Sequence, residues 1–310
     1  MRIGAIDIGT NSMRLLIADY EDGNLLNREK FVNTTRIGEG VDKKGYISQE
    51  AIQRNIDGLI DFNRMCKDRK CEKVYCIGTS ALRDSKNGDD FIQLAKNKAD
   101  IDVEIISGKE ESTLGFIGVA EGLTDRLKEE ESILVLDIGG GSTEFILGNL
   151  KGIKFNKSEN IGAVRMTEKF LKADPISEEE FKSMIRFIEE QINDTIEFLK
   201  NKKIDKVVGI GGTITSISAI NQELETYSME KIHNSSVDIE EVEKILQNLK
   251  KMTLNDKKNL KGLQPKRADI ITSGVKILQI IMKKIEIKNI IVSEYDNLEG
   301  LICRKSQKMS

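Results

Sequence analysis

Short apolar runs alternate with longer amphipathic stretches along most of the chain. In the first half, apolar runs over 3–6, 15–18, 25–34, 73–77 and 102–106 predict strands. Apolar residues three and four positions apart predict a helix over about 48–66, which Ser48 would cap, and another helix begins at Ser107. Strand hairpins followed by crossover helices indicate a mixed sheet covered by helices.

The second half repeats this plan with longer helices. Apolar runs over 133–136, 145–147, 207–210 and 289–293 predict strands, and helical patterns cover 177–200, 238–250, 270–284 and, at the end, about 297–308. Only Pro175 and Pro265 occur, and no low-complexity linker separates the halves. We therefore expect two closely packed α/β domains, 1–124 and 125–310. The terminal helix would either stay with the second domain or pack back on the first.

One turn pattern occurs in both halves. Asp7-Ile8-Gly9-Thr10-Asn11-Ser12 recurs 130 positions later as Asp137-Ile138-Gly139-Gly140-Gly141-Ser142, each time between two apolar strands. Glycine lets backbone N–H groups approach an anion, and Ser or Thr hydroxyls add donors. An Asp at the strand end can hold Mg²⁺. One copy alone would match an ordinary hairpin turn. Two such hairpins facing a cleft would hold a phosphate chain from both sides.

Composition narrows the classes of function. The chain has 310 residues and a net charge of −3, which argues against a nucleic-acid binder. No apolar run approaches the length of a membrane span and no secretory signal is visible, so we expect a cytoplasmic protein without a membrane partner. The single histidine, His233, excludes metal sites and phosphohydrolase modules built on several histidines, and it is expected either to be structural or to support a neighbouring site residue. The four cysteines have no Cys-x-x-Cys spacing and are expected to be reduced and mostly buried.

Glu111 and Glu144 are candidate catalytic acids. Ser107 and Glu110 have the spacing of a capping box, so Glu110 has a structural role and Glu111 has none that the pattern explains. Glu111 is either an ordinary first-turn glutamate favoured by the helix dipole or a base that activates water. Glu144 is either an exposed strand residue or an acid suited to Mg²⁺ or water. Its counterpart in the first hairpin is Arg14, a cation suited to phosphate.

Two further segments allow more than one interpretation. Arg83 follows Thr79 and Ser80 at a strand end, where it is either a surface arginine or a cation that neutralises a transferred phosphoryl group. The turn at Gly211, Gly212 and Thr213 is either a phosphate site or a tight connection to the next helix. The candidate phosphate-binding residues are therefore Gly9, Thr10, Asn11, Ser12, Arg14, Gly139, Gly140, Gly141, Ser142, Thr143, Gly211, Gly212 and Thr213, and the candidate metal ligands are Asp7, Asp137 and Glu144.

Several of these segments together resemble the exopolyphosphatase/guanosine pentaphosphate phosphohydrolase family. The matching segments, in chain order, are 5–16, 79–84, 106–111, 137–144, 211–213 and 265–269. The resemblance implies two RNase H-like (actin-like ATPase) domains that face a central cleft. It also implies a general base at Glu111, a phosphate-binding arginine at Arg83, acids for Mg²⁺ and water at Asp137 and Glu144, and a phosphate loop ending at Ser142.

The resemblance implies a Mg²⁺-dependent hydrolase that removes the terminal phosphate of polyphosphate, with guanosine pentaphosphate of the stringent response as the alternative substrate. The chain departs from the family at Ser112 and Thr113 and at Asp296–Gly300, which lacks an arginine that many members carry. It also ends where longer members continue into a helical module. A homodimer is left open. A small-molecule kinase and a non-hydrolysing actin-like regulator are the other classes considered.

Overall fold

The computed structural model describes residues 1–307, and its contacts divide the chain into two compact units. The first unit combines Met1–Glu121 with the C-terminal segment from Tyr295, and the second is the continuous stretch Gly122–Glu294. By its contacts, the terminal helix α14 (Asn297–Gln307) belongs to the first unit. The predicted end of this helix at residue 308 lies outside the described residues.

The first unit is built on a five-stranded sheet in the order β3-β2-β1-β4-β5. Strands β1, β2 and β3 pair antiparallel, whereas β4 and β5 continue the sheet in parallel to β1. The strands are β1 (Arg2–Ile8), β2 (Met13–Glu21), β3 (Asn24–Asn33), β4 (Lys73–Gly78) and β5 (Val103–Ile105). The helical segments are α1 (Val41–Lys44), α2 (Gln49–Asp68), α3 (Ser80–Asp84), α4 (Gly88–Leu94), η1 (Ala95–Ala99), α5 (Gly108–Gly122) and α14.

The second unit repeats the topology of the first and adds one edge strand. Its sheet has the order β10-β11-β9-β6-β7-β8, in which β8-β7-β6-β9-β11 corresponds to β3-β2-β1-β4-β5, both in order and in strand direction. The strands are β6 (Ile133–Ile138), β7 (Thr143–Asn149), β8 (Gly152–Glu159), β9 (Lys206–Ile210), β10 (Ser236–Asp238) and β11 (Asn289–Val292). The mixed α/β architecture expected twice in the sequence is thereby confirmed.

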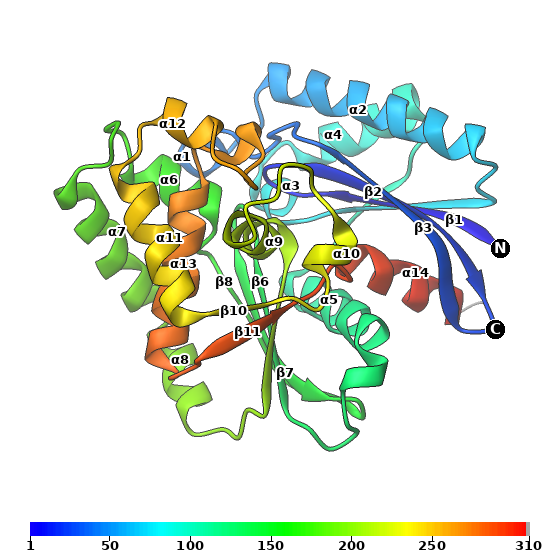
Figure 1. Ribbon diagram of the computed structural model, residues 1–310. Coiled ribbons are helices and arrows are strands. Elements are labelled where there is room, and N and C mark those ends of the chain that lie inside the picture. The colour runs from blue at the N-terminus through cyan, green and yellow to red at the C-terminus, as the bar shows by residue number, and fades with distance from the viewer. Residues whose placement is uncertain (308–310) are drawn as a thin grey trace. The chain divides into compact units, whose positions relative to one another are not determined.

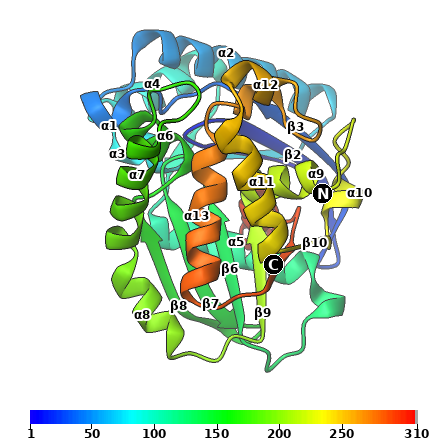
Figure 2. The same cartoon turned by 60° about the vertical axis from the view of Figure 1, so that its left-hand side comes forward.

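Helices of the second unit pack on its sheet through a large apolar core. Figure 2 shows α7, α13 and α11 beside one another over this sheet, and α13 contacts α6, α7, α11 and β6. The helical segments are η2 (Thr124–Arg126), α6 (Ala163–Phe170), α7 (Glu178–Gln191), α8 (Asn193–Lys200), α9 (Gly211–Asn221), α10 (Met229–Ile232), α11 (Ile239–Lys251), α12 (Leu254–Lys258), η3 (Pro265–Arg267) and α13 (Ile271–Lys284).

The two faces of the first sheet are covered by different helices. Ile6 and Ile8 pack with α2 residues on one face, whereas Ile3 and Ala5 pack with residues of α5 and α14 on the other (Figure 1). Because side chains alternate along a strand, Asp7 lies on the same face as Ile3 and Ala5. The sheet therefore places Asp7 on the face that α5 and α14 cover.

One predicted helix is wrong in its extent. The pattern over 177–200 suggested a single helix, but the structure has two, α7 and α8, separated at Ile192 (φ −97°, ψ 2°). Asn193 and Asp194 follow the break, and their side chains compete for backbone hydrogen bonds in helices. The apolar period continues across the break, so the pattern alone does not reveal it.

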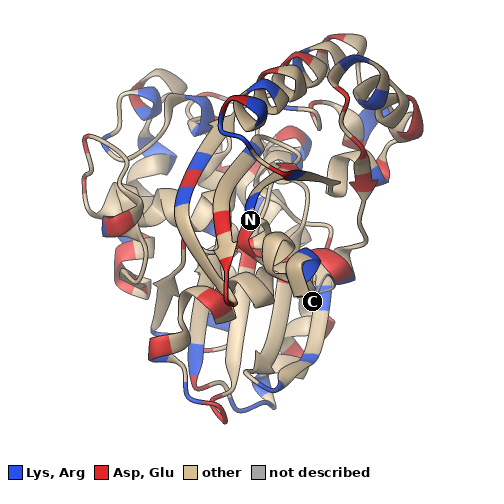
Figure 3. Ribbon diagram, turned by 90° about the vertical axis from the view of Figure 1, so that its right-hand side faces the viewer, with Lys and Arg blue, Asp and Glu red and all other residues tan. Residues whose placement is uncertain are grey.

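Charged residues of both signs occur along the same elements, as the alternation along α2 illustrates (Figure 3). Across residues 1–307, none of the helices combines the length and apolar character needed to cross a bilayer. His233 has the structural role expected of it. Its Nδ1 accepts the N–H of Glu294 (3.3 Å), so its Nε2 donates to the carbonyl of Gly122 (3.1 Å) and ties together the two ends of the second unit.

Candidate active site

The two repeated turns have the same backbone geometry. The Gly9 N–H donates to the Ser12 carbonyl at 3.1 Å, and the Gly139 N–H donates to the Ser142 carbonyl at 3.0 Å. In the flanking strands, Asp7 pairs with Arg14 and Asp137 pairs with Glu144. Directly opposed residues of an antiparallel pair project to the same face. The register therefore confirms the predicted equivalence of Arg14 and Glu144.

The segment that follows β3 or β8, a loop in the first unit and the start of α6 in the second, donates hydrogen bonds to the turn of its unit. In the first unit, the N–H groups of Arg36 and Gly38 donate to the Asn11 and Thr10 carbonyls at 2.9 and 3.0 Å. In the second, the N–H groups of Ala163 and Val164 donate to the Gly139 and Gly140 carbonyls, both at 2.9 Å. The turns are thus held by bonds to their carbonyl groups.

The donors of both turns point to anion binding. Within residues 1–307, the backbone N–H groups of Thr10, Asn11, Gly140 and Gly141 donate to no other protein group. Successive N–H groups of this kind form a concave site for an anion. Gly162 also approaches the second turn closely, since a Cβ there would lie 2.4 Å from the Gly140 carbonyl oxygen. A larger residue at 162 would displace the turn.

In the first unit, Asp7 and Arg14 belong to a buried ionic network. The Arg14 guanidinium pairs with Asp7 and, at 2.6 Å, with Asp296 at the start of α14. Lys30 and Arg28 of β3 pair with Glu299 on the same helix, and Lys30 also contacts Asp296 at 3.6 Å. Because two carboxylates already balance its charge, a phosphate contact by Arg14 stays a prediction.

The two carboxyls that share Arg14 have pKa values shifted in opposite directions. Burial raises the pKa of Asp7 above its usual value, and Arg14 offsets this only in part. Burial also acts on Asp296, but Arg14, Lys30 and the Leu298 N–H outweigh it and lower its pKa to about 2. One oxygen of Asp7, Oδ1, is buried without a hydrogen-bond partner, as is Asn11 Oδ1 in the adjacent turn. These two oxygens are open to a cation or its waters.

Glu111 and Arg83 come together in the first unit. Glu111 lies in the first turn of α5 with only 8% of its surface exposed, and its carboxylate is 3.2 Å from Arg83 Nη1. Arg83, in α3, also donates to the Ile106 carbonyl at 2.9 Å, so it is not a plain surface arginine. The capping box of Ser107 and Glu110 is confirmed by reciprocal hydrogen bonds of 3.0 and 3.2 Å. The cap fixes the turn from which Glu111 projects.

The second unit places two acids opposite one another. Asp137 ends β6 and Glu144 begins β7, and they are 8% and 1% exposed. The alternative that Glu144 is an exposed strand residue is therefore wrong. Ser158 donates to Glu144 Oε1 at 2.7 Å. Like charges directly opposite in a sheet destabilise it, so a cation would stabilise this pair in its ionised form.

The third glycine turn lies beside this acid pair. Gly211 begins α9 with φ +81°, and a Cβ there would be 2.3 Å from Asp137 Oδ1. Glycine at 211 thus lets the start of α9 approach the carboxylate. A Cβ on Gly212 would lie 2.0 Å from Arg267 Nη1, so the Arg267 guanidinium covers this turn, and Thr213 is buried in the next position.

Sequence reasoning missed the two arginines beside the second unit's turns. Arg165 of α6 donates from Nε to the Gly141 carbonyl at 2.8 Å, and Arg267 lies over Gly212. The Pro265–Asp269 segment contained a signal for Arg267, but nothing in the pattern connected Arg165 to a turn 24 residues earlier. Among the predicted residues, Thr143 has a structural contact, because its hydroxyl donates to the Ile161 carbonyl at 2.6 Å.

The donor set fits Mg²⁺ as a cofactor that shares its coordination with a substrate. Within residues 1–307 there is no group of three or more acidic, histidine or cysteine side chains able to enclose a metal. Mg²⁺ usually takes only one or two carboxylates and completes its shell with water and phosphate oxygens. The opposed Asp137 and Glu144, and the unpartnered Asp7 Oδ1, supply carboxylates of this kind.

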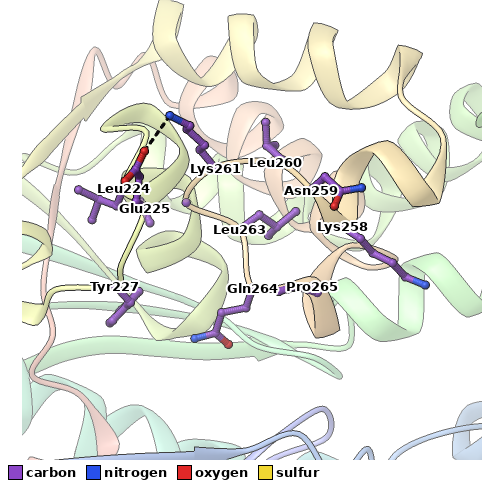
Figure 4. A pocket seen from close by; sticks show the side chains of 12 residues that line it. Leu224, Glu225, Tyr227, Lys258, Asn259, Leu260, Lys261, Leu263, Gln264 and Pro265 are labelled. Atoms are coloured by element: carbon purple, nitrogen blue, oxygen red, sulfur yellow. Dashed lines mark hydrogen bonds and ion pairs between the residues drawn. The ribbon is translucent and has the colours of Figure 1, made fainter.

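A separate pocket of about 430 Å³ lies within the second unit. The residues from Lys258 to Pro265 line one side, and Leu224, Glu225 and Tyr227 line the other (Figure 4). Lys261 and Glu225 form an ion pair of 3.0 Å at its edge. The wall also includes Ala219 of α9, eight residues after Gly211, so the pocket begins roughly 12 Å along the helix from the Gly211 turn.

The duplicated sheet and the two phosphate-type hairpins define the actin-like class of two-domain proteins. The chain belongs to the Ppx/GppA phosphatase family, whose model matches residues 16–309. The match confirms the family resemblance seen in the sequence. It also confirms the expected class of enzyme, because family members are named as phosphoanhydride hydrolases.

Curated relatives carry the names of several phosphatases. Exopolyphosphatase 2 of Mycobacterium tuberculosis is 32% identical, and the match covers 97% of both chains. A bifunctional 3-dehydroquinate synthase/phosphatase of Fusobacterium nucleatum is 38% identical over 96% of this chain, which spans about half (46%) of that protein. The guanosine-5′-triphosphate,3′-diphosphate pyrophosphatase of Vibrio vulnificus is 29% identical over 96% of this chain and 58% of its own length.

Solved structures confirm the predicted fold. A Ppx/GppA family member from Aquifex aeolicus has a TM-score of 0.83 at 30% identity, covering 100% of this chain and 99% of its own. An exopolyphosphatase from Cytophaga hutchinsonii has a TM-score of 0.90 at 28% identity, covering 99% and 98%. The similarity extends over both units of the chain.

Proposed function

We propose that this protein is a Mg²⁺-dependent exopolyphosphatase that removes the terminal phosphate of inorganic polyphosphate. The observation that carries the proposal is the pair of Glu111 and Arg83, a nearly buried carboxylate 3.2 Å from a guanidinium in the unit that also holds the Gly9–Ser12 turn. Phosphoryl transfer to water requires a base that activates the water, a cation that neutralises charge on the phosphoryl group, and correct positioning of both.

In the proposed reaction, Glu111 accepts a proton from a water molecule as its oxygen attacks the terminal phosphorus. The bond between that phosphorus and the bridging oxygen breaks, giving inorganic phosphate and a chain shorter by one unit. Arg83 compensates charge on the transferred group, and N–H groups of the Gly9–Ser12 turn in the same unit orient the phosphates. Mg²⁺ would neutralise phosphate charge, and its candidate ligands are Asp137 and Glu144 in the second unit and, separately, Asp7 in the first.

Guanosine pentaphosphate is the second candidate substrate, and the pocket in the second unit favours it. Polyphosphate has no base or sugar, whereas guanosine pentaphosphate carries both. Tyr227, Asn259 and Gln264 offer polar groups among leucine side chains, and the volume lies within the range of small-molecule sites. Replacing Asn259 and Gln264 together by Ala should raise the KM for guanosine pentaphosphate and leave the KM for polyphosphate unchanged.

The test is phosphate release from long polyphosphate, short polyphosphate, guanosine pentaphosphate and ATP, each with Mg²⁺ and with a chelator. The proposal expects release from polyphosphate without any acceptor and loss of that release on chelation. Preference for guanosine pentaphosphate would favour the second candidate. ATP-dependent phosphorylation of an added sugar, with no release from either polyphosphate, would instead indicate a kinase.

A further inference from the structure

Helix α2 ends in a Schellman motif with a cysteine at each of the two positions that this motif brings into contact. The Cys71 N–H donates to the Cys66 carbonyl at 2.9 Å, and the Lys70 N–H donates to the Lys67 carbonyl at 3.0 Å. Lys70 has the left-handed φ of 57° that the motif requires. Side chains three residues inside the helix end and two beyond it pack together in this motif.

The two thiols therefore meet as a direct consequence of the backbone. Cys66 is 1% exposed and lies under β1, where a Cβ on Gly4 would be 2.6 Å from its sulfur. Cys71 is half-buried, so it alone of the pair reaches solvent. The Cys66 S–H donates a hydrogen bond to the sulfur of Cys71. The Cys71 thiol is therefore accessible to a small reagent, and the buried Cys66 thiol is its neighbour.

The surroundings of the pair favour a reactive Cys71. The hydrogen bond from Cys66 lowers the pKa of Cys71, and Arg2 and Arg69 lower it further, against burial and Asp19. Arg2 pairs with Asp19 and Glu29, Arg69 pairs with Glu29, and Glu72 accepts the Arg2 N–H. The same hydrogen bond and burial raise the pKa of Cys66. Burial also raises the pKa of Cys76 and of Cys303.

We propose that Cys66 and Cys71 are a modification site at which a low-molecular-weight disulfide oxidises the protein to an intramolecular disulfide. The proposal is independent of the phosphatase activity, because the pair lies at the start of β1 and the Gly9–Ser12 turn follows the other end of that strand. It rests on the helix-end geometry that sets two thiols in contact.

The chemistry proceeds in two thiol–disulfide exchanges. The Cys71 thiolate attacks one sulfur of the small disulfide, whose other sulfur leaves as a thiolate and takes a proton from water. Cys66 then loses its proton to solvent base and attacks the Cys71 sulfur, and the remaining small thiolate leaves. Two protein thiols are thereby oxidised by two electrons, and one small disulfide is reduced to two small thiols.

The experiment uses the full chain, reduced and then incubated natively with oxidised glutathione. The product is denatured in iodoacetamide and its alkylated cysteines are mapped by mass spectrometry. The proposal expects two of the four cysteines to escape alkylation. It also expects a peptide in which Cys66 is linked to Cys71 and whose mass is two hydrogens below that of the reduced form. In the untreated native protein, iodoacetamide should label Cys71 at least about tenfold faster than Cys76 or Cys303.

Variants separate this pair from general thiol oxidation. Cys71→Ser should leave every remaining cysteine alkylatable, and Cys66→Ser should stop at a stable glutathione adduct on Cys71. Cys76→Ser and Cys303→Ser should form the same link as the parent. A parent that keeps all its thiols, or a link that involves Cys76 or Cys303, would overturn the proposal. Cys66 is buried, so the Cys66→Ser variant could fail to fold. In that case the Cys71→Ser and Cys76→Ser results test the proposal.

Discussion

At the scale of single residues, the opposed pair in each hairpin distinguishes the two units. The first hairpin sets Asp7 against Arg14, and the second sets Asp137 against Glu144. The first pair neutralises itself, whereas the second leaves two buried carboxyls side by side. The same strand register thus gives one turn an internal ion pair and sets two carboxyl groups, the proposed Mg²⁺ ligands, opposite one another beside the other turn.

Mutation of the acid pair should change the Mg²⁺ requirement. Asp137→Asn and Glu144→Gln each remove one charge from the proposed metal site, so the Mg²⁺ concentration for half-maximal phosphate release should rise by about 10–100-fold. Asp205→Asn is the control, because Asp205 accepts the Ser132 N–H before the start of β6, at the opposite end from Asp137. An unchanged Mg²⁺ titration in both site variants would remove these acids from the metal site.

Arg83 offers a second test at this scale. Arg83→Ala should lower kcat/KM for polyphosphate on the order of 10²–10³-fold, because it removes both a charge for the phosphoryl group and the partner of Glu111. Arg83→Lys should recover part of this loss. Arg64→Ala, in an exposed pair with Asp61, is the matched control. Kinetics like those of the control would return Arg83 to a structural role.

At the scale of elements, sequence reasoning found the hairpins but not what surrounds them. The repeated Asp–Gly turn between apolar runs needs only local information, so both turns and their register were predictable. The Asp296 carboxylate that holds Arg14 is 282 positions away, and Arg165 comes from a helix that the apolar pattern did not reveal. Such contacts join residues that are far apart in the sequence, and a local pattern of apolar and polar residues does not predict which distant segments pack together.

The approach of α9 to Asp137 gives a test of element packing. Gly211→Ala places a Cβ 2.3 Å from Asp137 Oδ1 at φ +81°, so it should destabilise the fold by about 1–3 kcal/mol and lower activity. Gly23→Ala is the control, with a similar φ of +86° and no atom within 4 Å of the new Cβ. Denaturant unfolding and phosphate release measure the two effects. Equal losses in the two variants would mean that the contact with Asp137 does not matter.

At the scale of the whole molecule, the chain leaves the first unit at Glu121 and returns to it at Tyr295. The return is anchored by the ionic network in which Arg14, Lys30 and Arg28 meet Asp296 and Glu299. Arg28 also stacks 3.6 Å from the centre of the Tyr295 ring. Charges from β2 and β3 thereby fix the last helix to the N-terminal sheet. The prediction that the two domains face one cleft stays a prediction.

This ionic network is expected to contribute to the free energy of unfolding at neutral pH and to lose that contribution at low pH. The pKa of Asp296 is about 2 in the folded chain, against an ordinary value of 3.8, so the unfolded chain binds the proton first as the pH falls. The contribution is therefore complete above about pH 4 and is lost towards pH 2. Asp296→Asn should cost about 3–5 kcal/mol at pH 7 and less at pH 2. Denaturant unfolding at several pH values measures it, and an equal cost at every pH would contradict the assignment.

The most direct test of the central claim compares Glu111→Gln with Glu110→Gln in phosphate release from polyphosphate with Mg²⁺. The two glutamates are neighbours in one helical turn, but Glu110 closes the capping box and only Glu111 pairs with Arg83. We predict that Glu111→Gln lowers kcat by about 10²–10⁴-fold with polyphosphate still bound, and that Glu110→Gln stays within a few-fold of the parent. A kcat for Glu111→Gln within a few-fold of the parent would contradict the account.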